Sequence, residues 1–209
     1  SAEIQFQQGK YQQAIEGFTN YLAKYPKGQN AIQAYYYRGE SYASNNLKQY
    51  PKALQDYSAV VAKGPSRLYP KAAEKATLLS LNVDKNYVQG FEFARKWEES
   101  ATTDASRFDA QLNALQAAYF TNNSVAVGEY ANKVTSSNLA SNSQVATANF
   151  YLGKMAYDKN DFPRAYPALQ AVTENASTEI MAESWHLLAQ ILYKQKKYAD
   201  AEQTIGDAN

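Results

Sequence analysis

Apolar positions along the chain recur at the spacing of amphipathic helices. The clearest stretch is WHLLAQIL, where Trp185, Leu188 and Leu192 share one helix face. A short polar turn follows, and a second apolar stretch begins at Tyr198. Two amphipathic helices joined by such a turn form a helix hairpin, and the alternation of helix and turn runs through the whole sequence. The pattern therefore predicts an all-α protein.

One motif recurs in the second helix of each hairpin. An aromatic residue is followed three positions later by a small one, as at Tyr11 and Ala14. A degenerate copy begins at Ser124, where the aromatic residue is absent. The small positions are 14, 53, 90, 127, 165 and 201, at intervals of 39, 37, 37, 38 and 36 residues. Spacing this constant predicts about six repeats, which cover approximately 1–26, 30–65, 68–100, 106–137, 144–177 and 180–209.

Packing between helices explains why this position carries a small residue. Where the two helices of a hairpin touch, a larger side chain would overpack the contact and cost about 1–3 kcal/mol. Aromatic residues fill the wedge between one hairpin and the next. A single hairpin cannot bury its apolar face alone, so stacked hairpins share one continuous core. We therefore expect Ala14, Ala53, Ala165 and Ala201 to be buried.

Position by position, the chain resembles a tetratricopeptide repeat array, with the pattern W-x2-L-G-x2-Y and then Y-x2-A-x3-F-x2-A-x4-P. The last copy carries Trp185, Leu188, Ala189, Leu192, Tyr198 and Ala201 in register. The copy that begins at Tyr35 has Arg38 where leucine is usual. The resemblance covers the whole chain and is weakest over 68–140. It implies a right-handed superhelical solenoid of antiparallel helix hairpins, with incomplete terminal repeats.

The resemblance also implies a partner-binding groove. In this family the first helix of each hairpin lines a concave face that holds a segment of another protein. Carried over, the groove residues are Gln33, Tyr36, Glu40, Lys75, Asn82, Asp109, Gln116, Tyr119, Phe150, Lys154, Tyr157, His186, Gln190 and Tyr193. Family members that clamp a C-terminal carboxylate use Lys and Asn at set positions. Because Leu79 follows Lys75 by four residues, no such clamp is expected here.

Composition limits the kinds of partner and site that the chain can have. Twenty-one Lys and Arg residues against twenty Asp and Glu leave a net charge of +1, and the basic residues are scattered, so a nucleic-acid partner is not expected. With no cysteine, disulfides and thiolate metal sites are excluded. No apolar run approaches the roughly 20 residues that cross a bilayer, which predicts a soluble segment. The chain opens inside a helix and closes inside a motif, so we expect a fragment of a longer protein.

Candidate catalytic chemistry is sparse. His186 is the only histidine, and its spacing from Glu183 matches one half of a di-iron helix motif that has no second half here. A single histidine outside a G-x-S-x-G context supplies no Ser-His-Asp set. The pair Glu98-Glu99 reads as solvated helix surface, and the isolated glycines form no phosphate loop. The sequence therefore predicts a protein that is not an enzyme, with no metal site and no cofactor.

The function class follows from the resemblance. Residues 11–46 are most similar to bacterial cell-envelope members of the family, such as the periplasmic coordinator of the Tol-Pal system and the lipoprotein that assists outer-membrane barrel assembly. This implies a periplasmic or outer-membrane-associated protein-interaction module. Two alternatives stay open: binding of a carbohydrate or small ligand through groove tyrosines such as Tyr36 and Tyr157, and self-association into a homo-oligomer. Tyr119, Tyr157 and Tyr193 either bind a ligand or pack on the adjacent hairpin.

Overall fold

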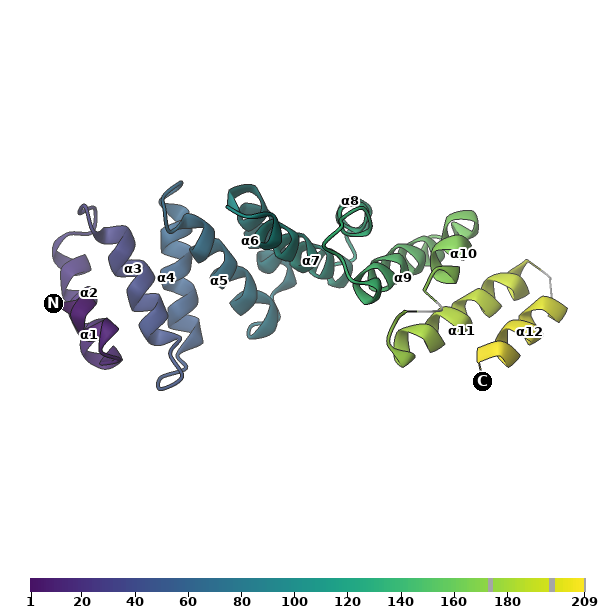
Figure 1. Cartoon of the computed structure of the whole chain (residues 1–209), viewed down its shortest axis with the longest axis horizontal. Coiled ribbons are helices and arrows are strands. Elements are labelled where there is room, and N and C mark those ends of the chain that lie inside the picture. The colour runs from purple at the N-terminus through teal and green to yellow at the C-terminus, as the bar shows by residue number, and fades with distance from the viewer. Residues whose placement is uncertain (173–174, 196–197, 209) are drawn as a thin grey trace. The chain divides into compact units, whose positions relative to one another are not determined.

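The structure, a computed structural model, describes residues 1–172, 175–195 and 198–208, without the side chains of 198–201. Over these residues the chain forms twelve α-helices and no strand (Figure 1). The helices are α1 (Ala2–Gln7), α2 (Tyr11–Lys24), α3 (Ala31–Tyr42), α4 (Tyr50–Ala62), α5 (Tyr69–Asn82), α6 (Tyr87–Ser100), α7 (Asp104–Phe120), α8 (Ser124–Thr135), α9 (Asn142–Asp158), α10 (Phe162–Gln170), α11 (Thr178–Lys194) and α12 (Tyr198–Ala208). The predicted all-α class is confirmed.

The helices form two compact units, residues 1–113 and 114–209, with the boundary inside α7. In the first unit α1 packs on α2, α3 on α4 and α5 on α6, and the successive pairs also touch through α2 with α3 and α4 with α5. In the second unit α9 packs on α10 and α11 on α12, and α10 contacts α11. Each unit is therefore a stack of helix hairpins, which is the predicted solenoid arrangement.

The turns between the two helices of a hairpin share one backbone conformation. In the five hairpin turns from α1–α2 to α9–α10, one residue lies in the left-handed region: Gly9, Lys48, Lys85, Asn122 or Asn160, with φ between 49° and 74°. Each lies five positions before the small residue of its repeat. The next N–H along the chain then donates back to a carbonyl of the first helix, as from Asn123 to Ala118 at 2.9 Å. The repeat is thus fixed at the turn as well as at the packed faces.

Short polar side chains at these turns start the second helix of several hairpins. Asn86 Oδ1 accepts a hydrogen bond from the Gln89 N–H at 3.1 Å, and Asn123 Oδ1 accepts one from the Ala126 N–H at 3.1 Å. Such bonds satisfy N–H groups that have no partner in the first turn of a helix. The polar turns seen in the sequence therefore begin helices as well as separate them.

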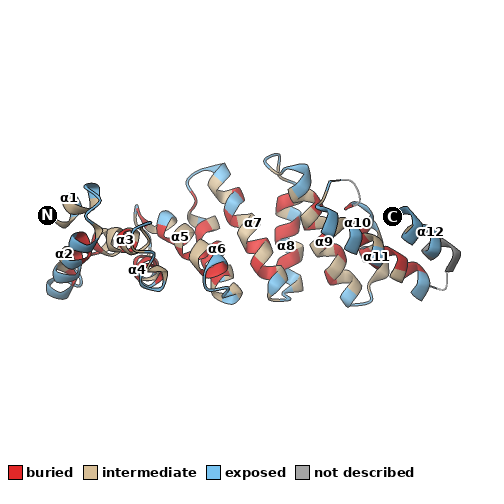
Figure 2. Cartoon of the chain, turned by 90° about the horizontal axis from the view of Figure 1, so that it is seen from below, coloured by how far each residue is buried: buried red, intermediate tan, exposed pale blue. Residues whose placement is uncertain are grey.

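The small positions lie where expected. Ala14, Ala53 and Ala165 are 0% exposed, and Val127 is 1% exposed. Gly90 is buried, and a Cβ atom there would lie 2.3 Å from Leu81 Cδ2. In Figure 2 the buried residues form bands along the helices, and exposed residues cover the turns and much of α2 and α12. The prediction is confirmed for these positions; the side chain of residue 201 lies outside the described residues.

A few buried polar contacts join helices, both between neighbouring hairpins and within one hairpin. Trp97 of α6 is 2% exposed, and its Nε1–H donates to Ser106 Oγ of α7 at 2.9 Å. Arg38 of α3 binds Asp56 of α4 through two hydrogen bonds, and Asp56 is only 3% exposed. These contacts fix which faces of adjacent helices meet, and so position the surface described next.

Candidate ligand-binding cavity

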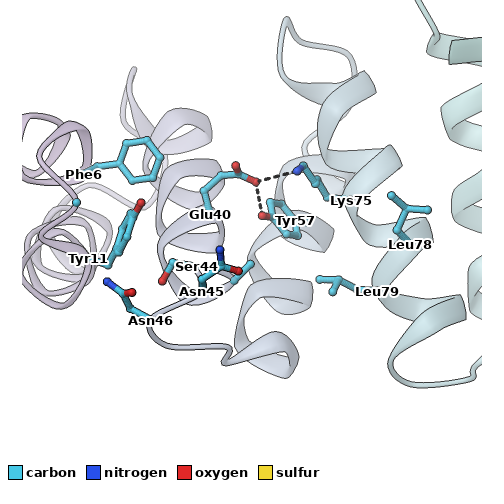
Figure 3. Close-up of a pocket in the computed structure, with 12 residues that line it drawn as sticks. Phe6, Tyr11, Glu40, Ser44, Asn45, Asn46, Tyr57, Lys75, Leu78 and Leu79 are labelled. Carbon is cyan, nitrogen blue, oxygen red and sulfur yellow. Dashed lines mark hydrogen bonds and ion pairs between the residues drawn. The ribbon is translucent and has the colours of Figure 1, made fainter. Parts of the chain in front are cut away.

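A cavity of about 650 Å³ opens in the first unit, and residues of five helices and two turns line it (Figure 3). They are Phe6, Gly9, Tyr11, Glu40, Ala43, Ser44, Asn45, Asn46, Tyr57, Lys75, Leu78 and Leu79. Two of them, Glu40 and Lys75, belong to the predicted groove. The volume is within the range of small-ligand sites and can also take a few side chains of a partner.

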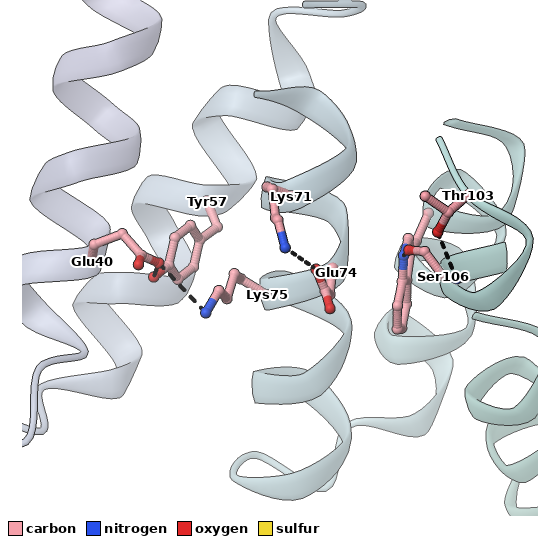
Figure 4. A network of polar contacts seen from close by, with 8 residues as sticks. Glu40, Tyr57, Lys71, Glu74, Lys75, Thr103 and Ser106 are labelled. Carbon is pink, nitrogen blue, oxygen red and sulfur yellow. Dashed lines mark hydrogen bonds and ion pairs between the residues drawn. The ribbon is translucent and has the colours of Figure 1, made fainter. Parts of the chain in front are cut away.

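Glu40 is the polar centre of this cavity. Its carboxylate accepts a hydrogen bond from the Tyr57 hydroxyl, and Oε1 lies 3.9 Å from Lys75 Nζ (Figure 4). Burial and the neighbouring Glu40 charge raise the pKa of Tyr57 above its ordinary value, so its hydroxyl remains a donor. The Glu40 side chain is 26% exposed and that of Lys75 is 42% exposed. A partner can therefore reach both charges.

The walls of the cavity differ from its centre. Phe6 contacts Tyr11 edge to face, with ring centroids 5.9 Å apart, and lies 5.1 Å from the Tyr37 ring. Figure 3 shows Phe6 and Tyr11 on one side, with Leu78 and Leu79 on the other. The exposed amides of the turn between α3 and α4, at Asn45 and Asn46, complete the rim. Aromatic surface, amides and one ion pair suit a polar peptide better than a purely apolar ligand.

Two predicted groove residues are buried, which corrects their expected exposure. Tyr36 is 8% exposed, because its ring packs against Tyr57 at a centroid distance of 5.7 Å. Phe150 is 4% exposed within the core of the second unit. Both rings support the surface from behind, since tertiary packing turned them inward from the positions that the family register implied.

The other predicted residues of the first unit do not gather at this cavity. Gln33 lines two neighbouring cavities beside α1, of about 400 and 530 Å³. Asn82 lies exposed at the end of α5, and Asp109 lies exposed on α7. Their predicted role in binding stays a prediction.

In the second unit the predicted residues form smaller groups. Tyr119 stacks on Tyr151 with ring centroids 3.9 Å apart, so this tyrosine does pack on the adjacent hairpin. Burial, helped by Glu183, raises the pKa of Tyr119 to about 12. Gln116 is half-buried on the same helix.

The remaining groove residues lie on α9 and α11. Lys154 binds Asp158 at 3.0 Å and lies over the Tyr157 ring at 5.7 Å. His186 is exposed, and its Nε2 is 3.4 Å from Gln190 Nε2. Tyr193 is 56% exposed. Among the described residues, no three His, Cys, Asp or Glu side chains are grouped so as to hold a metal ion.

Several cavity residues were not predicted as site residues. Tyr11 and Tyr57 belong to the repeat motif, and the motif indicated only a packing role for them. The amides at Asn45 and Asn46 were read as a turn. The signal that could have found the two amides is the turn itself, since the copy at Tyr35 carries two extra turn residues and residues of this turn line the cavity.

Comparisons with known proteins bear on the fold. Residues 1–73 match a tetratricopeptide repeat family model, and residues 113–208 match the model of anaphase-promoting complex, cyclosome, subunit 3. Among solved structures, PilW, a widely conserved type IV pilus biogenesis factor, aligns with a TM-score of 0.53 and 15% identity over 97% of this chain and 86% of its own. The TPR domain of P58(IPK) aligns at 0.45 and 14% identity, over 99% of this chain and 57% of its own.

No match is found among curated protein sequences. The PilW alignment shows a shared fold, and the fold and the repeat match together place the chain in the class of TPR-like helical solenoids. Proteins of this class generally present extended surfaces to protein partners. No helix within the described ranges has the length and apolar content that crossing a bilayer requires.

Proposed function

We propose that this chain is a non-catalytic protein-interaction module that binds a segment of a partner protein at the cavity between α1 and α5. The observation that carries the proposal is the cavity of about 650 Å³, where aromatic, amide and charged side chains from three successive hairpins converge. A partner segment would bury ring surface of Phe6 and Tyr11, and such anchors contribute most of the binding free energy in typical interfaces.

The charged centre gives the site its chemistry. Glu40 is held by Tyr57 and faces Lys75 across 3.9 Å, which is longer than a hydrogen bond. A peptide group can bind from the open side of this pair, with its N–H directed to the carboxylate and its carbonyl to the ammonium. The amides of Asn45 and Asn46 offer both donors and acceptors to a peptide backbone at the rim.

We place this activity in a bacterial cell envelope. The support is the resemblance of residues 11–46 to envelope members of the repeat family; PilW, which shares the fold, is itself described as a pilus biogenesis factor. The saccharide alternative rested on Tyr36 and Tyr157. Because Tyr36 is 8% exposed, it offers no free face to a sugar ring, and the protein-binding proposal is favoured.

The test is site-specific photo-crosslinking of the full chain in envelope extracts. A photoreactive amino acid at Asn46, on the cavity rim, should give a discrete protein adduct. The same amino acid at Gln55, exposed on α4 and outside the cavity lining, is the matched control and should not. Equal adducts from both positions, or none from Asn46, would contradict the proposal.

A further inference from the structure

A second cavity, of about 670 Å³, lies in the other unit among α10, α11 and α12. None of the groove residues predicted from the sequence lines it. Its walls come from one face of α10, from Trp185 and Leu192 of α11, and from the second half of α12. It shares no lining residue with the first cavity, so it is a separate site.

The α10 face is made of prolines and aromatic rings. Pro163, Tyr166 and Pro167 fall at positions i, i+3 and i+4, which lie together on a helix. Pro167 sits inside α10, which has 9 residues, whereas α2 and α6 have 14 each. Proline removes a backbone donor and disfavours further helix. The short helix leaves both prolines exposed at the cavity.

Three aromatic rings complete the apolar part. Tyr166, Trp185 and Phe162 are each half-buried, and all three line the cavity. Lys194 lies over the Phe162 ring at 5.7 Å, so Tyr166 and Trp185 are the rings available to a ligand. Aromatic rings beside prolines form the kind of groove that receives polyproline II segments, whose rigid proline rings lie flat on aromatic faces.

The polar lining matches the backbone of such a segment. A proline-rich chain has carbonyl groups but few N–H groups, so its binding site must supply donors. The lining includes the side-chain amides of Gln195 and Gln203 and the indole of Trp185, which can only donate. Among the described lining residues Asp207 is the only charged one, and it is exposed. A carboxylate at one end favours a ligand with a basic residue there.

We propose that this cavity binds a proline-rich segment of a partner protein in the polyproline II conformation, with a basic residue beside Asp207. The site is independent of the cavity between α1 and α5. The two proposals therefore fail separately: variants at one site leave binding at the other unchanged.

The experiment uses the full chain and a fluorescein-labelled peptide of about nine prolines followed by one arginine, long enough for three turns of polyproline II. Fluorescence anisotropy should rise saturably. Tyr166→Ala should weaken binding at least about tenfold, because a central aromatic anchor is lost. A peptide with alternate prolines replaced by glycine should bind more weakly, since its bound conformation is no longer preorganised.

The role of the Asp207 charge is tested by measuring two protein variants against two peptides that differ in their last residue. Asp207→Asn should weaken the arginine-ended peptide about two- to fivefold, as expected for an exposed pair, and leave a glutamine-ended peptide unchanged. Glu202→Gln, an exposed carboxylate on the same helix and outside the cavity lining, is the control and should have no effect. This cycle decides the question even if Tyr166→Ala perturbs folding.

Three results would overturn the proposal. The first is no saturable rise in anisotropy with the wild-type chain. The second is a loss with Glu202→Gln equal to that with Asp207→Asn, which would indicate general charge attraction. The third is a saturable change in tryptophan fluorescence with maltotriose that Trp185→Phe abolishes, and no change with the peptide, which would assign the cavity to a saccharide.

Discussion

Arg38 and Asp56 form a two-pronged ion pair between α3 and α4, with Nε to Oδ2 at 2.8 Å and NH2 to Oδ1 at 2.7 Å. Asp56 is 3% exposed, and burial raises the pKa of its carboxyl although Arg38 opposes the shift. Arg38 stands where the repeat pattern has leucine. The charge inside this hairpin is therefore tolerated because the facing helix supplies a matching carboxylate.

Removing one partner of this pair should be far more costly than removing both. Arg38→Leu leaves Asp56 buried and unpaired, and should lower the free energy of unfolding by about 3–5 kcal/mol. Combining it with Asp56→Leu should restore most of that loss, because no charge then remains buried. Urea denaturation of the two single variants and the double variant measures this coupling. A loss below about 1 kcal/mol for Arg38→Leu would show that water or another group satisfies Asp56.

Two glycines should respond to alanine in opposite directions. A Cβ at Gly90 would lie 2.3 Å from Leu81 Cδ2, so Gly90→Ala should destabilise by about 1–3 kcal/mol. At Gly128, inside α8, a Cβ meets nothing within 4 Å, and Gly128→Ala should stabilise by about 0.5–1 kcal/mol. Thermal unfolding of both variants provides the comparison. A Gly90→Ala variant as stable as the wild type would show that the tight contact at the small position is not what the repeat requires.

The hairpin turns offer a stabilising change. Lys85 has φ 53°, a left-handed conformation that costs a non-glycine residue about 1–2 kcal/mol. Lys85→Gly should therefore raise the free energy of unfolding, by about 0.5–1 kcal/mol after the greater freedom of glycine in the unfolded chain is counted. Lys52→Gly, on an exposed position within α4, should instead destabilise. Urea denaturation midpoints distinguish the two outcomes, and a destabilised Lys85→Gly variant would refute the role of the turn.

Burial of Tyr119 makes stability sensitive to alkaline pH. Its pKa is about 12 in the fold and about 10 in an unfolded chain. Because the pKa is higher in the folded state, the stabilisation is complete below pH 10 and is lost as the pH rises through 12. Tyr119→Phe should therefore lose less stability than the wild type between these pH values. Unfolding by urea at several alkaline pH values measures the difference, and identical slopes would contradict the assignment.

Much of this fold could be predicted from the sequence, because the repeat rests on local rules. The interval between small residues predicted the packed faces at Ala14, Ala53 and Ala165, and polar turns marked the hairpins. The partner of Arg38 could not be predicted, since Asp56 lies 18 residues away and carries no repeat signature. The left-handed conformation at Lys48 and Lys85 could not be predicted either, because lysine there occupies a position that usually favours glycine or asparagine.

The candidate site was only partly predictable. The family register placed Glu40 and Lys75 on one face, and the structure brings them within 3.9 Å. The same register predicted that Tyr36 faces the groove, but its ring packs on Tyr57 instead. Register gives the direction of a Cβ atom, whereas the final exposure of a large ring depends on the neighbouring hairpin. The cavity residues from the α3–α4 turn depend on the path of that turn, which no periodic pattern describes.

The most direct test of the central claim compares two lysines of α5. Lys75 lines the cavity, whereas Lys71, one turn away, binds Glu74 and does not line it (Figure 4). With the partner identified by crosslinking at Asn46, binding should weaken at least about tenfold in Lys75→Glu and change less than about twofold in Lys71→Glu. Equal effects from the two variants, or none from Lys75→Glu, would contradict binding at the cavity between α1 and α5.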